Sequence, residues 1–215
     1  MLLENLRVEV LAAALNLLKY GLVTLTGGNV SGRDKTTGYV AITPSGMDYE
    51  QLSAEDIVIV DMDGNKVDGK WKPSVDTEDH LYIYKHKPNL YGIIHTHAPY
   101  ACSFAILQKE IPCCSTTLAN EVGGSVPVAS YASVAGGLMG PAVVEVIGDK
   151  NACLLANHGV ISVGESVKHA LIAAVMLEDG AKVYHLAKCM GDPVPLSEIE
   201  IEKARNVFLY TYGQD

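Results

Sequence analysis

Two histidines separated by one residue stand at the end of an apolar stretch, in the order His95-Thr96-His97. Residues 90–95 predict a buried strand, and side chains two positions apart on a strand point to the same face. Both imidazoles can then reach one metal ion. The alternative is two polar residues that hydrogen-bond water or backbone at a strand end, and the pair alone favours neither interpretation.

Two further residues could join such a site, although each has a simpler explanation. His158 lies in a predicted turn beside Gly159, where a lone histidine is more often a loop residue than a ligand. Asp76 precedes a predicted helix over residues 77–87, a position where an isolated carboxylate is usually an N-cap. His80, one turn later, could pair with Asp76 or be a rival ligand. Three imidazoles and a carboxylate would suit zinc or another divalent ion with an open position.

Three segments combine glycine with short polar side chains, which suits them to binding an anion. Exposed backbone N–H groups and small donors can hold a phosphate group locally. The simpler interpretation of each segment is an ordinary turn, and none matches a nucleotide-binding loop. The segments are Gly27-Gly28-Asn29, Thr43-Pro44-Ser45-Gly46 and Pro73-Ser74.

The elements that would position these residues alternate between helices and short strands, which predicts a single mixed α/β domain over residues 1–215. Residues 26–32 are expected to form a loop, because glycines and small hydroxyl residues dominate them. Hydrophobic spacing and end signals predict helices over residues 2–20, 77–87, 99–107, 134–147, 166–190 and 197–209. Short strands are predicted over residues 39–43, 57–61, 65–67, 90–95, 153–156 and 160–163, with another near Val126.

Composition excludes several classes of protein. The chain has 215 residues and a formal net charge of −9, which argues against a nucleic-acid partner. Its longest clean apolar stretch, Ala170 to Leu177, is too short to cross a bilayer, and the first residues lack the basic start of an export signal. Five cysteines without a Cys-x-x-Cys pair indicate free thiols, so a cytoplasmic protein is expected.

Taken in order, these segments resemble the class II aldolase/adducin family, which includes L-fuculose-phosphate aldolase and L-ribulose-5-phosphate 4-epimerase. The resemblance extends over nearly the whole chain and keeps the family's order. The matching runs are Gly28-Asn29-Val30-Ser31, Ile42-Thr43-Pro44-Ser45-Gly46, Pro73-Ser74-Val75-Asp76 through His80, Ile94-His95-Thr96-His97, Asn157-His158-Gly159 and Tyr212-Gly213-Gln214.

The resemblance implies a three-layer αβα fold with a largely antiparallel central sheet, assembled as a homotetramer with active sites at subunit boundaries. It implies zinc held by His95, His97 and His158, with Asp76 at the family's acidic position as a ligand, a base or both. Tyr212 matches a catalytic tyrosine that comes from a neighbouring subunit. The residues expected to bind the phosphate of a ketose substrate are Gly28, Asn29, Ser45, Gly46 and Ser74.

Departures from the family patterns bear on the choice of reaction. Asp76 replaces the aldolase's Glu, and Thr116 stands where the aldolase has a catalytic Tyr. The epimerase pattern agrees at both positions, but its catalytic Asp is Asn120 here and its C-terminal His falls near Ile201. Because Asn cannot take up a proton as a carboxylate does, cleavage of a ketose 1-phosphate such as L-fuculose 1-phosphate is favoured, as in fucose catabolism. The products would be dihydroxyacetone phosphate and a short aldehyde such as lactaldehyde.

Other functions remain open at this point. They are epimerisation of a pentulose 5-phosphate, dehydration of a ketose phosphate, an adducin-like interaction domain without metal, and a purely structural zinc site. Retention of all three histidines and Asp76 argues against the interaction domain. A loosely placed carboxylate beside three imidazoles leaves a coordination position open, which argues against structural zinc.

Overall fold

An eight-stranded sheet forms the centre of the computed structural model, which describes residues 1–133 and 136–211. The strand order is β4-β3-β2-β1-β5-β8-β7-β6, and all neighbouring pairs are antiparallel except β6 and β7. The strands are β1 Gly28–Arg33, β2 Val40–Ile42, β3 Val58–Val60, β4 Lys66–Asp68, β5 Gly92–Thr96, β6 Val128–Ala129, β7 Ala152–Leu155 and β8 Gly159–Gly164. The predicted largely antiparallel α/β fold is confirmed.

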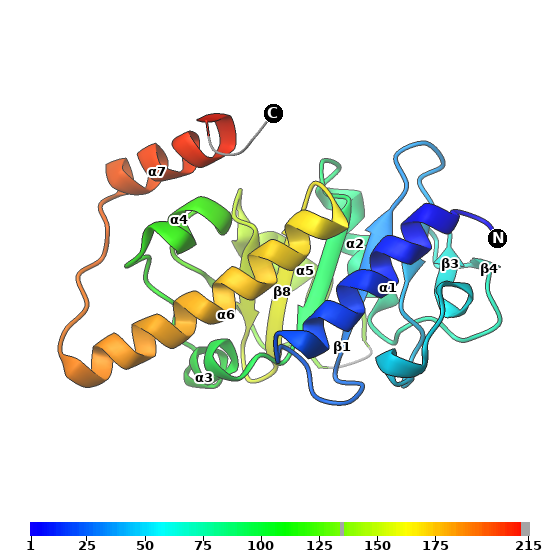
Figure 1. The fold of residues 1–215 in the computed structure, drawn as a ribbon, viewed down its shortest axis with the longest axis horizontal. Coiled ribbons are helices and arrows are strands. Elements are labelled where there is room, and N and C mark those ends of the chain that lie inside the picture. The colour runs from blue at the N-terminus through cyan, green and yellow to red at the C-terminus, as the bar shows by residue number, and fades with distance from the viewer. Residues whose placement is uncertain (134–135, 212–215) are drawn as a thin grey trace.

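Helices cover both faces of this sheet. The long helices α1 and α6 lie side by side across one face, and α2 and α5 pack on the other (Figure 1). A third apolar cluster joins α3, α4 and α7 to the β7 end of the sheet. The helices are α1 Glu4–Lys19, α2 Thr77–His86, α3 Pro99–Leu107, α4 Thr116–Glu121, α5 Met139–Ile147, α6 Val167–Met190 and α7 Glu198–Thr211, with 3-10 turns at Tyr49–Gln51 and Ala54–Asp56.

Strand β5 is buried on both faces, which explains why the consecutive residues Ile93 and Ile94 are both apolar. Ile94 packs in the cluster beneath α1 and α6, whereas Ile93 packs in the cluster with α2 and α5. His95 lies two positions beyond Ile93 and therefore faces the α2 side. The pairing of β1 with β5 places Asn29 directly opposite His95, on the same face of the sheet.

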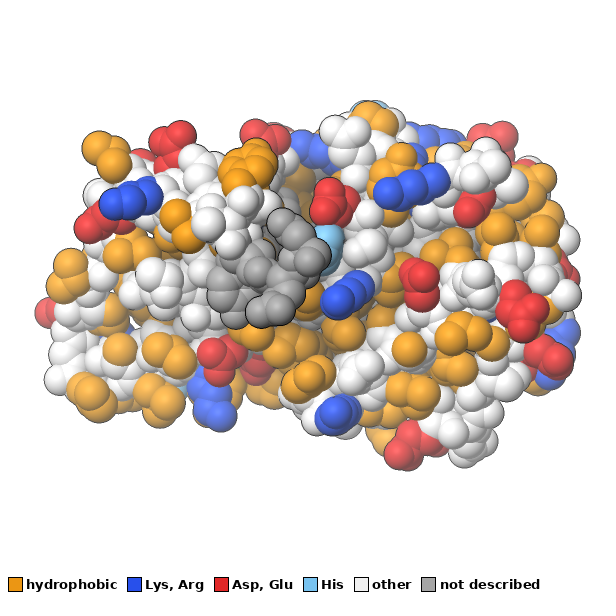
Figure 2. Space-filling model, turned by 45° about the horizontal axis from the view of Figure 1, so that its top comes forward, with side chains coloured by type: hydrophobic (Ala, Val, Ile, Leu, Met, Phe, Trp, Pro, Cys, Tyr) orange, Lys and Arg blue, Asp and Glu red, His pale blue; other side chains and the backbone are white. Residues whose placement is uncertain are grey.

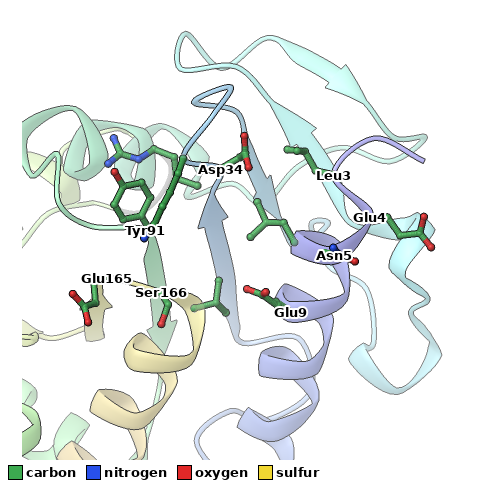
Figure 3. Close-up of a pocket in the computed structure, with 12 residues that line it drawn as sticks. Leu3, Glu4, Asn5, Glu9, Asp34, Tyr91, Glu165 and Ser166 are labelled. Carbon is green, nitrogen blue, oxygen red and sulfur yellow. The ribbon is translucent and has the colours of Figure 1, made fainter. Parts of the chain in front are cut away.

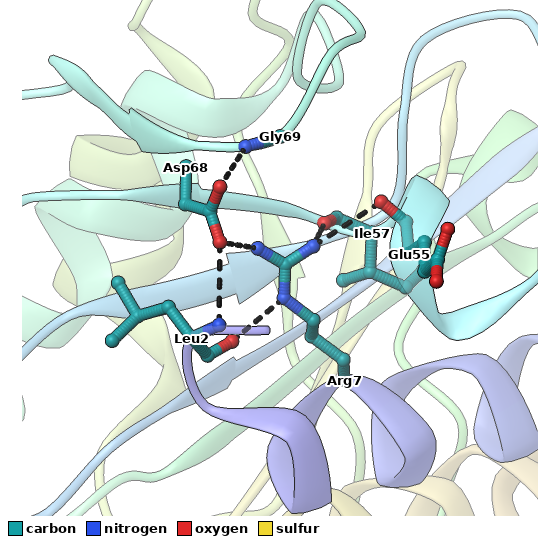
Figure 4. Close-up of polar contacts among 6 residues, drawn as sticks. All are labelled: Leu2, Arg7, Glu55, Ile57, Asp68 and Gly69. Atoms are coloured by element: carbon teal, nitrogen blue, oxygen red, sulfur yellow. Dashed lines mark hydrogen bonds and ion pairs between the residues drawn. The ribbon is translucent and has the colours of Figure 1, made fainter.

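A buried arginine fixes the start of α1 to the β3–β4 edge (Figure 4). The Arg7 guanidinium is almost fully buried and donates to the carbonyl oxygens of Leu2, Glu55 and Ile57. It also forms an ion pair with Asp68, at 2.6 Å between Nη2 and Oδ2. All three guanidinium nitrogens are therefore paired, as a buried charge requires.

Several sequence expectations need correction. Residues 28–32, predicted as part of a loop, belong to strand β1. The glycines there serve close packing rather than a turn, because a Cβ on Gly32 would come within 2.7 Å of both Leu6 and Val167. Helix α4 was not predicted, and α5 begins at Met139 rather than at residue 134. Near Val126 the described chain has an isolated bridge to Ile111, and strand β6 starts two residues later.

Other boundaries follow the prediction closely. Helix α3 has the predicted bounds, and its first residue is Pro99, whose missing N–H is harmless at that position. The Ser166 side chain caps α6 by accepting a hydrogen bond from the backbone N–H of His169. Both ends could be read because the signals are local side-chain and backbone chemistry.

On the face drawn in Figure 2, described lysine and arginine side chains lie singly among acidic and apolar ones. Of the helices within the described ranges, none has both the length and the apolarity that crossing a bilayer demands.

Candidate metal centre and active site

Three histidines meet at one end of the sheet. His95 is in β5, His97 lies just beyond the end of that strand, and His158 is in the turn between β7 and β8. Their ring centroids are 4.8 Å apart for His95 with His97, 4.8 Å for His95 with His158, and 5.3 Å for the third pair. One nitrogen from each ring lies within 4.8 Å of the other two, so a single cation could be held by all three.

The state of His95 suits a metal ligand. Its Nδ1 is 2.9 Å from the carbonyl oxygen of Val160, which can only accept, so Nδ1 carries the hydrogen and Nε2 keeps its lone pair. Burial, followed by the charges of the neighbouring histidines, lowers the pKa of His95 to about 3. Burial and His158 also lower the pKa of His97. Both rings are therefore neutral near pH 7, the form that binds metal.

The cluster is open on one side. His95 is buried, His158 is partly exposed and His97 is exposed. A cation held by the three rings would face solvent through His97 and His158, which leaves room for a fourth ligand supplied by substrate or water.

Two glycines make space for the rings. A Cβ on Gly159 would lie 2.7 Å from Cδ2 of His97 and 3.0 Å from Cε1 of His95. A Cβ on Gly27 would lie 3.3 Å from Nδ1 of His97. The imidazole donor set, the neutral rings and this close packing together fit a borderline divalent cation such as zinc.

Asp76 lies immediately before α2 but does not act as its side-chain cap. Its carboxylate Oδ2 instead accepts a hydrogen bond from Nδ2 of Asn29 at 2.6 Å, and the side chain is 95% shielded from solvent, at 5% exposure. The carboxylate is not part of the group of three histidines that share one point. The simple N-cap interpretation is therefore wrong, and the carboxylate is held against β1, the strand beside His95.

The segments expected to bind an anion adjoin one another. The backbone N–H of Ser74 donates to the carbonyl of Thr43, and that of Ser45 donates to the carbonyl of Lys72. The Thr43 hydroxyl accepts a hydrogen bond from the backbone N–H of Val30, which joins these loops to β1. Ser45 and Gly46 are exposed, whereas Ser74 and Asn29 are buried. Ser45, Gly46 and Ser74 thus come from loops, and Gly28 and Asn29 from the start of β1, which meet beside Asp76.

A sizeable cavity lies away from the three histidines. It has a volume of about 610 Å³ and lies at the opposite end of β1 and β5, where Arg33 and Tyr91 line it (Figure 3). Acidic side chains of Glu9, Asp34 and Glu165 surround it. None of the three histidines lines this cavity.

The remaining predicted residues are placed as follows. His80 is buried on α2 with Nδ1 2.7 Å from the Ser31 hydroxyl, so its side chain does not join the other histidines. Thr116 and Asn120 are on α4, which packs against α6 and α7. Tyr212 lies outside the described residues.

Comparison with known proteins identifies the family of this chain. The profile of the Class II Aldolase and Adducin N-terminal domain matches residues 8–185. The chain belongs to this family. A 5-deoxy-D-ribulose 1-phosphate aldolase from Bacillus thuringiensis serovar kurstaki is 36% identical over 214 residues, with 100% of both chains covered.

Solved structures agree. A structure of an L-fuculose 1-phosphate aldolase superimposes with a TM-score of 0.92 at 32% identity, covering 96% of this chain and 97% of the other. An L-fuculose-1-phosphate aldolase from Thermus thermophilus has a TM-score of 0.75 at 25% identity, with 88% and 98% covered. The chain is therefore a class II aldolase of the fuculose-phosphate aldolase type, an enzyme of the lyase class.

Sequence reasoning missed one part of this region. The Ser31 hydroxyl contacts both His80 and Tyr84 in the interior. Ser31 and Tyr84 were assigned no role, and His80 was considered only as a partner of Asp76 or a rival ligand. A signal was available, because Asn29 and Ser31 are two residues apart on a strand while His80 and Tyr84 are four apart on a helix. These spacings place each pair on one face of its element.

Proposed function

We propose that this chain is a divalent-metal-dependent aldolase that cleaves a ketose 1-phosphate to dihydroxyacetone phosphate and a short aldehyde. The observation that carries the proposal is the open cluster of three imidazoles, with the shielded Asp76 carboxylate held on the strand beside it. Loops rich in N–H donors adjoin that carboxylate.

His95, His97 and His158 would hold the cation, with zinc as the first candidate and another divalent metal as the alternative. A bound divalent cation supplies Lewis-acid charge that stabilises the enediolate left by carbon–carbon cleavage. In this mechanism the charge of the cation stabilises the enediolate, so no lysine is needed to form a Schiff base with the substrate. Whether Asp76 also contacts the cation stays a prediction.

Asp76 would move the proton at the enediolate carbon. Its hydrogen bond from Asn29 fixes the carboxylate before substrate arrives, and such positioning favours proton transfer. Tyr212, at the end of the chain, would assist at the departing aldehyde oxygen. Asp76 would then have the role that the longer Glu has in the aldolase pattern.

The substrate phosphate would lie against Gly28, Asn29, Ser45, Gly46 and Ser74. Backbone N–H groups and short side chains can bind one phosphate in a protein of net charge −9, because the interaction is local. The exposed Ser45 and Gly46 would form the outer part of this site, and the buried Asn29 and Ser74 the inner part.

The sugar is proposed as a short deoxyketose 1-phosphate. One relative over the full length of the chain is named for 5-deoxy-D-ribulose 1-phosphate, and a close structural neighbour is named for L-fuculose 1-phosphate. Both names specify a ketose with phosphate on carbon 1. This favours cleavage over epimerisation of a pentulose 5-phosphate, in line with Asn120 replacing the epimerase's catalytic Asp.

A homotetramer with active sites between subunits is part of the proposal. Thr116 and Asn120, which align with catalytic positions of relatives, are on α4 in the cluster with α7, whereas the histidines are at the ends of β5 and β7. A second copy could bring α4 and the chain end to this site. Mixing inactive His95→Ala and Tyr212→Phe subunits should then restore activity, and no recovery would contradict shared sites.

The decisive experiment is a substrate panel on purified protein with measured metal content. L-fuculose 1-phosphate, 5-deoxy-D-ribulose 1-phosphate and L-ribulose 5-phosphate are incubated with and without chelator. We expect dihydroxyacetone phosphate from one of the first two, loss of activity on chelation, and recovery on adding zinc. Conversion of the pentulose 5-phosphate to its epimer without dihydroxyacetone phosphate would instead support the epimerase.

A further inference from the structure

A buried row of polar side chains runs between α2 and β1, starting at Asp76. On the helix side it contains Asp76, His80 and Tyr84, each four residues from the next. On the strand side it contains Asn29 and Ser31, two residues apart. These spacings align one face of a helix with one face of a strand. We call these five residues the polar seam; each is at most 5% exposed.

The seam is tied together by short hydrogen bonds. Asn29 donates to Asp76 at 2.6 Å, and the Ser31 hydroxyl is 2.7 Å from Nδ1 of His80. The hydroxyls of Ser31 and Tyr84 are 3.0 Å apart, and Tyr84 also donates to the Ser31 carbonyl at 3.2 Å. The ring of His80 is thus fixed on its Nδ1 side.

Two polar atoms of the seam have no partner among the described residues. They are Nε2 of His80 and Oδ1 of Asn29, both buried. A buried polar group without a hydrogen bond destabilises the fold, so leucine at position 80 would serve a purely structural interface better. Two such atoms in the row that contains Asp76 point to a role for the seam in chemistry at this carboxylate.

The charges of Asp76 and His95 both act on His80. Burial lowers the pKa of His80 to about 4; Asp76 opposes this shift and His95 adds to it. The ring is therefore neutral near pH 7 and carries one hydrogen. The Tyr84 hydroxyl, whose pKa is raised by burial, keeps its proton and donates it to the Ser31 carbonyl. The Ser31 hydroxyl then has its own proton to donate to Nδ1 of His80. In this arrangement the hydrogen of His80 is on Nε2.

We propose that His80 is a positioning residue for Asp76, with its Nε2–H as the donor that orients the carboxylate when substrate is bound. Asn29 holds one carboxylate oxygen in the free protein, and His80 closes on the carboxylate as the site fills. Hydrogen bonds of this kind are often long in a free enzyme and tighten in the complex. The inference rests on the proposed function, in which Asp76 moves the proton.

The proton step can be measured without aldehyde. An aldolase of the proposed type exchanges one hydrogen on the hydroxymethyl carbon of dihydroxyacetone phosphate with solvent: the proton passes to Asp76 and a solvent deuteron returns to carbon. The exchange is followed by NMR in D₂O on the metal-loaded enzyme. Steady-state kcat and KM, metal content and thermal midpoint are measured on the same samples.

Three substitutions at one position separate the roles of the two ring nitrogens. In His80→Gln the amide nitrogen can replace Nε2, in His80→Asn it can replace only Nδ1, and His80→Leu removes both. We expect exchange and kcat to fall about ten- to a hundredfold in the Asn and Leu variants, with KM and metal content unchanged. His80→Gln should stay within about threefold of wild type, because it keeps the proposed donor.

Matched controls keep the test decisive. His86→Gln changes a histidine on the exposed side of α2 and should leave exchange unchanged. If His80→Leu does not fold, Ser31→Ala removes only the group that fixes the ring and should lower kcat without changing KM. Full exchange in a folded His80→Leu enzyme, or better activity in His80→Asn than in His80→Gln, would overturn the inference.

Failure of the underlying function would look different. Undiminished exchange in Asp76→Asn would show that Asp76 is not the base, and both proposals would fall. Loss of exchange in Asp76→Asn with wild-type exchange in His80→Leu would overturn only the positioning role. A His80→Leu enzyme that loses metal but has normal kcat per bound ion would likewise overturn it.

Discussion

Two buried polar regions of this molecule differ in how completely their atoms are paired. Around Arg7, each guanidinium nitrogen donates, and both oxygens of Asp68 accept hydrogen bonds. Around Asp76, buried atoms of Asn29 and His80 have no partner in the described structure, and three imidazoles converge on one point.

The difference separates stability from chemistry. A cluster whose polar atoms are all paired stabilises the folded chain, because removing any one partner would leave the others buried and unpaired. It has no free donor or acceptor that could bind a ligand. A cluster with unpaired atoms and neutral imidazoles is costly until something binds. The Arg7 cluster therefore positions α1, and the histidine region is where ligand and substrate act. Four substitutions or conditions can test this division.

The largest effect is expected for His95→Ala, which removes a buried ligand of the metal site. Activity should fall on the order of a thousandfold or more, because Lewis-acid stabilisation contributes several kcal/mol. Bound metal, measured by elemental analysis, should fall in parallel. His169→Gln, at an exposed position on α6, is the control and should retain both. Full activity in metal-free His95→Ala would refute the division.

Arg7→Met should have the opposite profile. It leaves three carbonyl oxygens and Asp68 without their donor, so the free energy of unfolding should drop by about 3 kcal/mol. Urea titration measures this loss, and kcat of the folded enzyme at low temperature should be unchanged. A drop in kcat with unchanged stability would mean that the N-terminal cluster contributes to the chemistry.

Gly159→Ala tests the close packing around the rings. Its Cβ would meet the Thr96 carbonyl oxygen at 2.6 Å as well as both His95 and His97. Metal affinity should weaken about ten- to a hundredfold, as with other changes that shift ligands. Gly191→Ala, where a Cβ meets nothing within 4 Å, is the control in a competition titration with a chromogenic chelator. Equal affinities for the two variants would contradict the packing argument.

The last test concerns pH in the metal-free protein. Burial lowers the pKa of His95 to about 3 and of His80 to about 4, from 6.5, so below pH 6.5 the unfolded chain binds more protons. The free energy of unfolding should be constant above pH 6.5. It should fall toward pH 4 by on the order of 1 kcal/mol per pH unit for each histidine. Urea midpoints between pH 5 and 7 measure the slope. His80→Leu should flatten it, whereas Arg7→Met should not.

The site could be predicted further than the sheet. His95-Thr96-His97 and His158 each stand at a strand end with glycine nearby, and family motifs linked them in order. By contrast, Gly28 to Gly32 were expected in a loop, because local propensity cannot reveal that two strands will pair on both sides of them. Helix α4 escaped prediction because six residues carry too little periodicity to be recognised.

The sequence by itself determined the imidazole pair and the helix ends at Pro99 and Ser166, since these depend on residue types at fixed short spacings. It also determined the family, because the motifs follow one another in the family's order along the chain. Only the tertiary structure decided that Asp76 is held by Asn29 rather than capping its helix, and that His80 is buried with one unpaired nitrogen. Contacts between β1 and α2 join residues more than 40 positions apart, and no local pattern encodes which of their atoms will find a partner.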